Sequence, residues 1–191
     1  MPKLVLFDID ETMISSNGAG RRAIGRLLRE RHPITEEHMA PVAMSGKTDP
    51  QIIREVLSAI GVPEKEIQET VDATAERYIE ILREEIENAG YYIVHEGVTD
   101  LIAAVVKHAD LYLGLLTGNV EKGARLKLEQ FGLNTHFPMG AYGSDSGNRL
   151  DLPAIACQRA LEQYGIKFQP HDVVIIGDAV NDILCARGYD A

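Results

Sequence analysis

The feature that most constrains the fold is a short apolar run near the amino terminus that ends abruptly in acidic residues. Leu4 to Phe7 are four consecutive apolar residues, a pattern typical of a strand buried on both faces in a parallel sheet. Asp8 and Asp10 follow. Because burying an unpaired carboxylate is costly, both acids should lie at the carboxyl end of the strand, where a cleft can open. Two acids at one edge need a compensating charge, and a divalent cation would supply it.

Composition excludes some functions. The chain has 191 residues, enough for one core domain with a smaller insertion. Acidic residues outnumber basic ones 29 to 19, and the formal net charge of −10 argues against a nucleic-acid-binding surface. We see no signal peptide and no apolar run of membrane-spanning length. The cysteines Cys157 and Cys185 are expected to be buried thiols in a reducing compartment, which predicts a cytoplasmic protein.

Residues 16–90 are expected to form a small helical unit, because they contain no convincing strand pattern. Apolar residues recur there at helical spacing and are interrupted by proline and glycine. The expected helices span residues 21–31, a segment from Thr48 or Asp49 to Ile60, and residues 64–88, with a loop-like segment at 34–47.

From Gly97 onward, expected strands and helices alternate. The strands are 111–116, a short one within 137–142, and 173–176; the helices are 98–108, 120–131, 152–164 and one that begins at 181. This alternation predicts an α/β fold, a Rossmann-like parallel sheet with right-handed crossovers. Since one strand precedes the helical unit, we expect a core of residues 1–15 and 91–191 with an all-helical cap of residues 16–90 inserted after the first strand. Such a sheet usually carries another strand or two at its end, which truncation at Ala191 would explain.

Three of the expected buried strands end in polar or acidic residues. Asp8 and Asp10 follow the first, Thr117-Gly118-Asn119 follow the second, and Asp178 and Asp182 follow the last. Ligands of open parallel sheets bind where the carboxyl ends of the strands converge. The combined site would offer carboxylates to a hard cation, and a hydroxyl and backbone N–H groups to anionic oxygens.

These segments resemble those of the haloacid dehalogenase superfamily, in particular its phosphatase branch with a helical cap, and most closely the phosphoglycolate-phosphatase-like group. The matching segments are Phe7 to Thr12, Leu116 to Asn119 and Ile176 to Asp182, in the same order and at similarly wide spacing. The resemblance therefore covers essentially the whole chain.

The resemblance implies a role for each residue. Asp8 would be the nucleophile that takes the phosphoryl group, and Asp10 would be the general acid and then the base. Thr117, Gly118 and Asn119 would bind the phosphoryl oxygens. The implied cofactor is Mg²⁺, held by Asp8, Asp178 and the Asp10 carbonyl, with Asp182 in support.

The chain departs from the family pattern in one place. The family usually has a lysine in the loop before the helix expected at 152–164, and here residues 146–153 contain none. Arg149 is the best candidate to neutralise the charges of the phosphoryl group and Asp8, with fork rather than point geometry. Lys122 and Lys127, on the helix after Thr117, are the alternatives.

Two other motif readings are weaker. A calcium-binding EF-hand loop beginning at Asp8 would need glycine and glutamate where the sequence has Met13 and Ala19. Residues 18–23 fit the relaxed dinucleotide fingerprint, but that fingerprint should begin at the end of a strand. A flexible entry into the helical unit explains these glycines better.

The expected activity is Mg²⁺-dependent hydrolysis of a small phosphorylated metabolite by a monomer or homodimer, with no nucleic-acid or membrane partner. An acid at position 10 favours a phosphatase or a phosphomutase of the β-phosphoglucomutase type over other branches of the superfamily. A non-catalytic ligand-binding module is a third possibility. Lys47, in the turn of residues 44–47, would either contact a second anionic group of the substrate or be part of an exposed turn.

Overall fold

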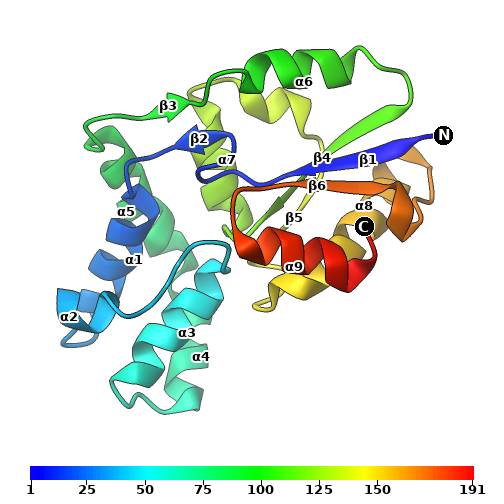
Figure 1. The fold of residues 1–191 in the computed structure, drawn as a ribbon. Helices are drawn as coiled ribbons and strands as arrows, with labels where there is room; N and C mark the ends of the chain where they lie inside the picture. Colours follow the sequence, from blue (N-terminus) through cyan, green and yellow to red (C-terminus); the bar gives the residue numbers. More distant parts are fainter.

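The computed structural model describes residues 1–191 and contains a central sheet of four parallel strands (Figure 1). The strands lie in the order β5-β4-β1-β6. Their bounds are β1 Lys3–Phe7, β4 Leu111–Thr117, β5 Gly140–Tyr142 and β6 Val173–Ile176. Strand β1 pairs with β4 on one side and β6 on the other, so the strand that carries the first acidic pair lies between two others.

Helices cover both faces of the sheet, and β1 shows why. Val5 and Phe7 pack in one apolar cluster with α6 and α7, whereas Leu4 and Leu6 pack in another with α8 and α9. Side chains alternate between the faces of a strand, so a run of four apolar residues fills both layers. These helices are α6 Val98–Val106, α7 Glu121–Glu129, α8 Leu152–Tyr164 and α9 Val180–Tyr189. The predicted α/β fold with a parallel sheet is confirmed.

Short elements connect this core to the helical unit and link the core helices. Strands β2 and β3 pair antiparallel where the chain enters and leaves the helical unit. Three single-turn 3₁₀ helices lie between the longer elements of the core. The bounds are β2 Ile14–Ser15, β3 Ile93–Val94, η1 Leu133–His136, η2 Arg149–Asp151 and η3 Pro170–Asp172.

The helical unit has an apolar core of its own. Its 16 buried apolar residues all lie between Ala19 and Leu82, apart from the two clusters of the sheet. The helices are α1 Ala19–Arg29, α2 Glu36–Met39, α3 Asp49–Ala59, α4 Glu64–Ala73 and α5 Ala75–Glu87. We propose that this unit is the cap, with the predicted boundaries at residues 16 and 90.

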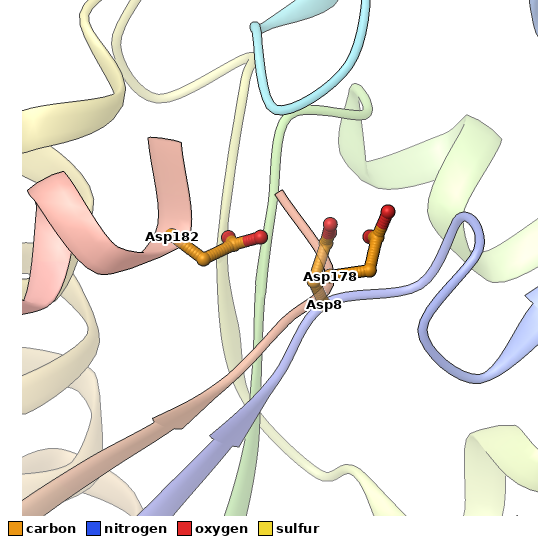
Figure 2. A group of neighbouring side chains, drawn as sticks. All are labelled: Asp8, Asp178 and Asp182. Atoms are coloured by element: carbon orange, nitrogen blue, oxygen red, sulfur yellow. The ribbon is translucent and has the colours of Figure 1, made fainter. Parts of the chain in front are cut away.

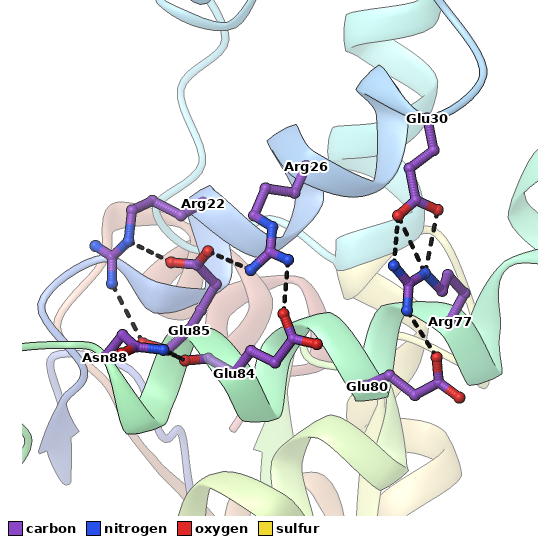
Figure 3. Close-up of polar contacts among 8 residues, drawn as sticks. All are labelled: Arg22, Arg26, Glu30, Arg77, Glu80, Glu84, Glu85 and Asn88. Carbon is purple, nitrogen blue, oxygen red and sulfur yellow. Dashed lines mark hydrogen bonds and ion pairs between the residues drawn. The ribbon is translucent and has the colours of Figure 1, made fainter.

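Ion pairs line the contact between α1 and α5 (Figure 3). Arg26 contacts Glu84 and Glu85 at 2.6 and 2.8 Å, and Arg77 contacts Glu30 at 2.7 Å. Because most of these side chains are partly exposed, water screens the ion pairs and they add little to stability. The buried residues beneath them, such as Ile24 and Ile81, hold the two helices together.

The single helix predicted at 64–88 is wrong, because the chain breaks at Thr74 into α4 and α5. Thr70 and Thr74 turn their hydroxyls back to the carbonyls four residues earlier, which competes with regular helical bonding. Moreover, α4 packs on α3 whereas α5 packs on α1, so the chain has to change direction between them.

Two smaller expectations also need correction. The segment expected as a loop at 34–47 contains the one-turn helix α2. Cys185 is buried as expected, but Cys157 is only partly buried, and both thiols are free. None of the helices combines the length and apolar character that crossing a bilayer requires.

Candidate active site

The polar ends of three neighbouring strands meet at one edge of the sheet. Asp8 follows β1, Thr117 ends β4, and Asp178 follows β6, all in parallel orientation. Figure 2 shows the carboxylates of Asp8 and Asp178 beyond their strands, with Asp182 reaching toward them from α9. Asp8 is 5% exposed and Thr117 is fully buried. The convergence expected from the sequence is therefore present.

A cavity of about 260 Å³ opens at this edge. Asp8, Thr117 and Arg149 of the core line it, together with Ser45 and Lys47 of the helical unit. Its hydrophobic lining residues are only Ile24, Met44 and Ile52. A cavity of this size and polarity suits a small polar molecule.

Three carboxylates at the cavity could hold a cation. Asp8, Asp178 and Asp182 each place one oxygen within 4.8 Å of the others. The hydroxyl of Thr12 donates to Asp178 at 3.1 Å, which orients that exposed carboxylate. Since Mg²⁺ prefers oxygen ligands and usually takes one or two carboxylates, this donor set fits the ion.

Asp182 is engaged on both oxygens. Oδ1 accepts a hydrogen bond from Arg149 at 2.5 Å, and Oδ2 accepts one from the backbone N–H of Ala179 at 3.0 Å. A Cβ on Gly177 would lie 2.2 Å from Asp182 Cγ, so only glycine fits there. These contacts suit Asp182 for positioning its neighbours at the site.

Arg149 lies between two buried carboxylates. Its guanidinium is 3.4 Å from Asp8 Oδ2 and 2.5 Å from Asp182 Oδ1, and its side chain is 6% exposed. Its buried Nε has no hydrogen-bond partner in the protein. Thus a cation lies beside Asp8, in the loop where the sequence placed it, with donor capacity left for an anion.

The two lysines that the sequence offered as alternatives lie elsewhere. Lys122 is exposed and pairs with Glu76 of the helical unit. Lys127 is buried, and its Nζ donates to both carboxylate oxygens of Asp10 at 2.7 Å. Neither lysine has an ion pair with Asp8, so Arg149 is the cation paired with that carboxylate.

Asn119 completes the contacts around Asp10. Its Nδ2 donates to Asp10 Oδ2 at 2.7 Å and to Thr117 Oγ1 at 2.8 Å, and its Oδ1 accepts from Lys127 at 2.6 Å. The sequence analysis missed the contact between Lys127 and Asp10. A signal was present, because Lys127 falls on the same helical face as Ala124 and Leu128, which are buried.

The helical unit packs closely against the site through the turn that carries Lys47. A Cβ on Gly118 would lie 2.0 Å from the Lys47 carbonyl oxygen, so the two backbones could not approach this closely with another residue at 118. Asn181 donates to the Ser45 carbonyl at 3.2 Å. The Lys47 side chain lines the cavity and pairs with Glu55 at 2.5 Å.

Two buried acids at the site have shifted pKa values. Burial raises the pKa of Asp8 from its usual 3.8 to about 6, although the Arg149 charge opposes this rise. Burial likewise raises the pKa of Asp49 to about 6, with the Lys127 charge opposing it. Asp49 also lines the cavity, whereas the sequence marked it only as an alternative start of the helix that ends at Ile60.

The Asp49 shift predicts a pH dependence of stability. Because its pKa is higher in the fold than the usual 3.8, its stabilising effect is fully present below pH 3.8 and is lost as the pH rises through about 6. When the pH is lowered from 8 to 5 in the presence of a chelator, we expect the free energy of unfolding of wild type to rise by about 1 kcal/mol more than that of Asp49→Asn. Urea unfolding at both pH values measures this difference. Equal gains in the two proteins would contradict the assignment.

Comparison with known proteins agrees with this geometry. The family model of the haloacid dehalogenase-like hydrolases matches residues 2–190. The chain belongs to this family. The family resemblance inferred from the three strand ends is thereby confirmed.

Curated proteins also match the chain. The tyrosine-protein kinase PtkA of Mycobacterium tuberculosis is 27% identical over 197 residues, which cover 99% of this chain and 60% of the relative. The chain thus spans about three fifths of the length of the curated relatives it matches.

Solved structures share the fold. CbbY from Rhodobacter sphaeroides, solved in complex with phosphate, is 21% identical with a TM-score of 0.71; the match covers 100% of this chain and 84% of that one. A predicted phosphoglycolate phosphatase from Haemophilus somnus is 17% identical with a TM-score of 0.62, covering 99% and 82% of the two chains. The likeness to both extends over the sheet and the helical unit.

Proposed function

We propose that this hydrolase is a Mg²⁺-dependent phosphomonoesterase that acts on a small phosphorylated metabolite through a phosphorylated Asp8. The observation that carries the proposal is the position of Asp8, which lies buried at a strand end between the guanidinium of Arg149 and the carboxylate of Asp178. A carboxylate there can approach an anionic phosphoryl group because the Arg149 charge lies on one side of it and a cation held with Asp178 would lie on the other.

In the first half of the proposed reaction, a carboxylate oxygen of Asp8 bonds to phosphorus and the ester oxygen leaves with the bonding electrons. Asp10 delivers its proton to that oxygen, which releases the alcohol. Thr117 and the backbone N–H of Gly118 donate to the phosphoryl oxygens. Arg149 contributes charge next to Asp8, and its unpartnered Nε–H can donate to the same group.

In the second half, Asp10 acts as the base. It takes a proton from a water molecule whose oxygen bonds to phosphorus, and the bond between phosphorus and the Asp8 oxygen breaks. Inorganic phosphate leaves, Asp8 is again a carboxylate, and Asp10 again carries its proton. One residue thus serves both halves of the cycle.

The metal would be held by Asp8, Asp178 and the backbone carbonyl of Asp10, with Asp182 in support. When bound, Mg²⁺ would supply positive charge against the carboxylates and the phosphoryl oxygens. The oxygen-only donor set near Asp8 supports this choice over softer metals.

The substrate is proposed to be small, because the cavity is about 260 Å³ and few of its lining residues are apolar. Lys47 and Arg21 line the cavity from the helical unit. We propose that Lys47 contacts the part of the substrate that leaves. These two cations could also hold a second phosphate, and that observation keeps a phosphomutase as the second candidate.

The test is a turnover assay of the purified chain with p-nitrophenyl phosphate, followed by a panel of phosphorylated metabolites, each in Mg²⁺ and in chelator. We expect Mg²⁺-dependent release of inorganic phosphate. Transfer of the phosphoryl group between positions of a sugar phosphate, without its release, would favour the mutase. Absence of metal-dependent turnover on every ester would contradict both.

A further inference from the structure

Asp49, at the start of α3, joins the helical unit to the loop after β4 by hydrogen bonds, beside the close backbone contact of Lys47 with Gly118. The backbone N–H of Asp49 donates to the Gly118 carbonyl at 2.8 Å, and its carboxylate Oδ2 accepts from the Val120 N–H at 3.0 Å. These two hydrogen bonds fall on either side of Asn119. Asp49 is therefore hydrogen-bonded to the backbone of the loop immediately before and after Asn119.

The surroundings leave this loop little freedom. A Cβ on Gly143 would lie 2.1 Å from the Gly118 carbonyl oxygen, so the loop is closely packed from the core side as well. Thr48 is fully buried, and its hydroxyl donates to the Gly147 carbonyl at 2.8 Å. The loop is thus held between the helical unit and the core.

Asn119 connects this loop to Asp10 through hydrogen bonds. Its amide group donates to the Asp10 carboxylate at 2.7 Å and accepts from Lys127 at 2.6 Å, and Lys127 donates to both Asp10 oxygens. Asn119 and Lys127 are both buried, so water competes little for these contacts. The direction of the Asp10 carboxylate depends on where Asn119 and Lys127 lie.

We propose that Asp49 is a positioning residue for the reaction, acting on Asp10 through Asn119. Docking of α3 on the loop fixes Asn119, and Asn119 together with Lys127 holds the Asp10 carboxylate in one orientation. Asp49 has hydrogen bonds to Gly118 and Val120 and none to Asp10, so we expect its effect in the step that needs the Asp10 proton. The proposal rests on the proposed phosphatase function and adds a residue of the helical unit to it.

The test exploits leaving groups. An alkoxide needs a proton as it departs, whereas 2,4-dinitrophenolate does not, so only alkyl esters depend on a well-placed Asp10. We expect Asp49→Ala to lower kcat/KM for an alkyl phosphate about 100-fold and to change kcat/KM for 2,4-dinitrophenyl phosphate by less than about 5-fold. The ratio kcat/KM is used because it reports on the transfer to Asp8 and excludes the later attack of water.

Two further variants sharpen the comparison. Asp49→Asn retains an oxygen that can accept from Val120, so it should restore most of the activity on the alkyl ester. In an Asp10→Asn background, adding Asp49→Ala should cause no further loss, because the residue it positions is already disabled. Should Asp49→Ala fail to fold, Asn119→Ala should give the same dependence on the leaving group.

Equal losses on both esters, or additive losses in the Asp10→Asn background, would overturn the proposal for Asp49. Those results would leave the proposed function standing, provided that wild type turns over both esters and Asp8→Asn neither. If wild type and Asp8→Asn do not differ on the dinitrophenyl ester, the proposed function itself fails. The two failures are therefore distinguishable in the same assay.

Discussion

Asp8→Asn is expected to lower kcat for phosphate esters by about 10³-fold or more, while the fold stays intact. An amide has no charged oxygen with which to attack phosphorus. No other carboxylate lies at the end of β1 beside Arg149, so none can replace Asp8 as the nucleophile. The substitution also removes a buried acid whose pKa is raised to about 6, so it costs the fold little. Turnover of p-nitrophenyl phosphate in Mg²⁺ measures the effect.

The matched control for this experiment is Asp145→Asn, a carboxylate in the loop after β5 that pairs with Arg159 away from the cavity. It should retain kcat within about 3-fold, since surface ion pairs contribute little. Thermal unfolding should show all three proteins folded. Turnover by Asp8→Asn at the wild-type rate would refute the role proposed for Asp8.

Arg149→Met should have the second large effect, and on two properties at once. Removing the guanidinium leaves the buried carboxylates of Asp8 and Asp182 without their partner, so we expect a loss of about 3 to 5 kcal/mol in the free energy of unfolding at pH 8. Affinity for a phosphate analogue such as vanadate, and kcat, should fall about 100-fold, because a charged donor beside Asp8 is gone.

Arg149→Lys and Lys122→Met separate these effects. Lysine retains the charge but has a single donor nitrogen and lacks the Nε–H that can donate to the phosphoryl group, so its losses should be intermediate. Lys122 is exposed and pairs only with Glu76, so Lys122→Met should resemble wild type in activity and stability. Unchanged vanadate affinity in a folded Arg149→Met protein would show that Arg149 does not serve the phosphoryl group.

Much of the fold could be predicted because burial on both faces leaves a simple mark in the sequence. The runs that became β1 and β6 are continuous in apolar residues, and an acid follows each within two positions. Of the two, only β1 is buried on both faces; the expectation of a buried last strand is wrong, because Val174 of the edge strand β6 is 44% exposed. The break at Thr74 could not be predicted in this way. The apolar stripe from Ile67 to Leu82 continues through it, and only the packing of α4 and α5 on different helices requires the bend.

Some residues of the candidate site could likewise be predicted from the sequence, and others could not. Residues directly after a strand were predictable, since the carboxyl ends of parallel strands share one edge. The apolar helical face that Lys127 shares with Ala124 and Leu128 indicates that it is buried, but no local pattern identifies Asp10, 117 positions away, as its partner. Asp49 shows the same limit, because an acid in the first turn of a helix is favourable without its contact to Val120; the cap itself is Thr48.

The central claim is that the phosphoryl group passes through Asp8, and trapping that state tests it most directly. Wild-type enzyme is mixed with a phosphate ester and Mg²⁺, quenched in acid within the first turnover, digested, and examined by mass spectrometry. We predict the mass of one phosphoryl group on the peptide that contains Asp8, and none on that peptide in Asp8→Asn. Turnover by wild type with the phosphoryl group bound to any other residue would contradict the account.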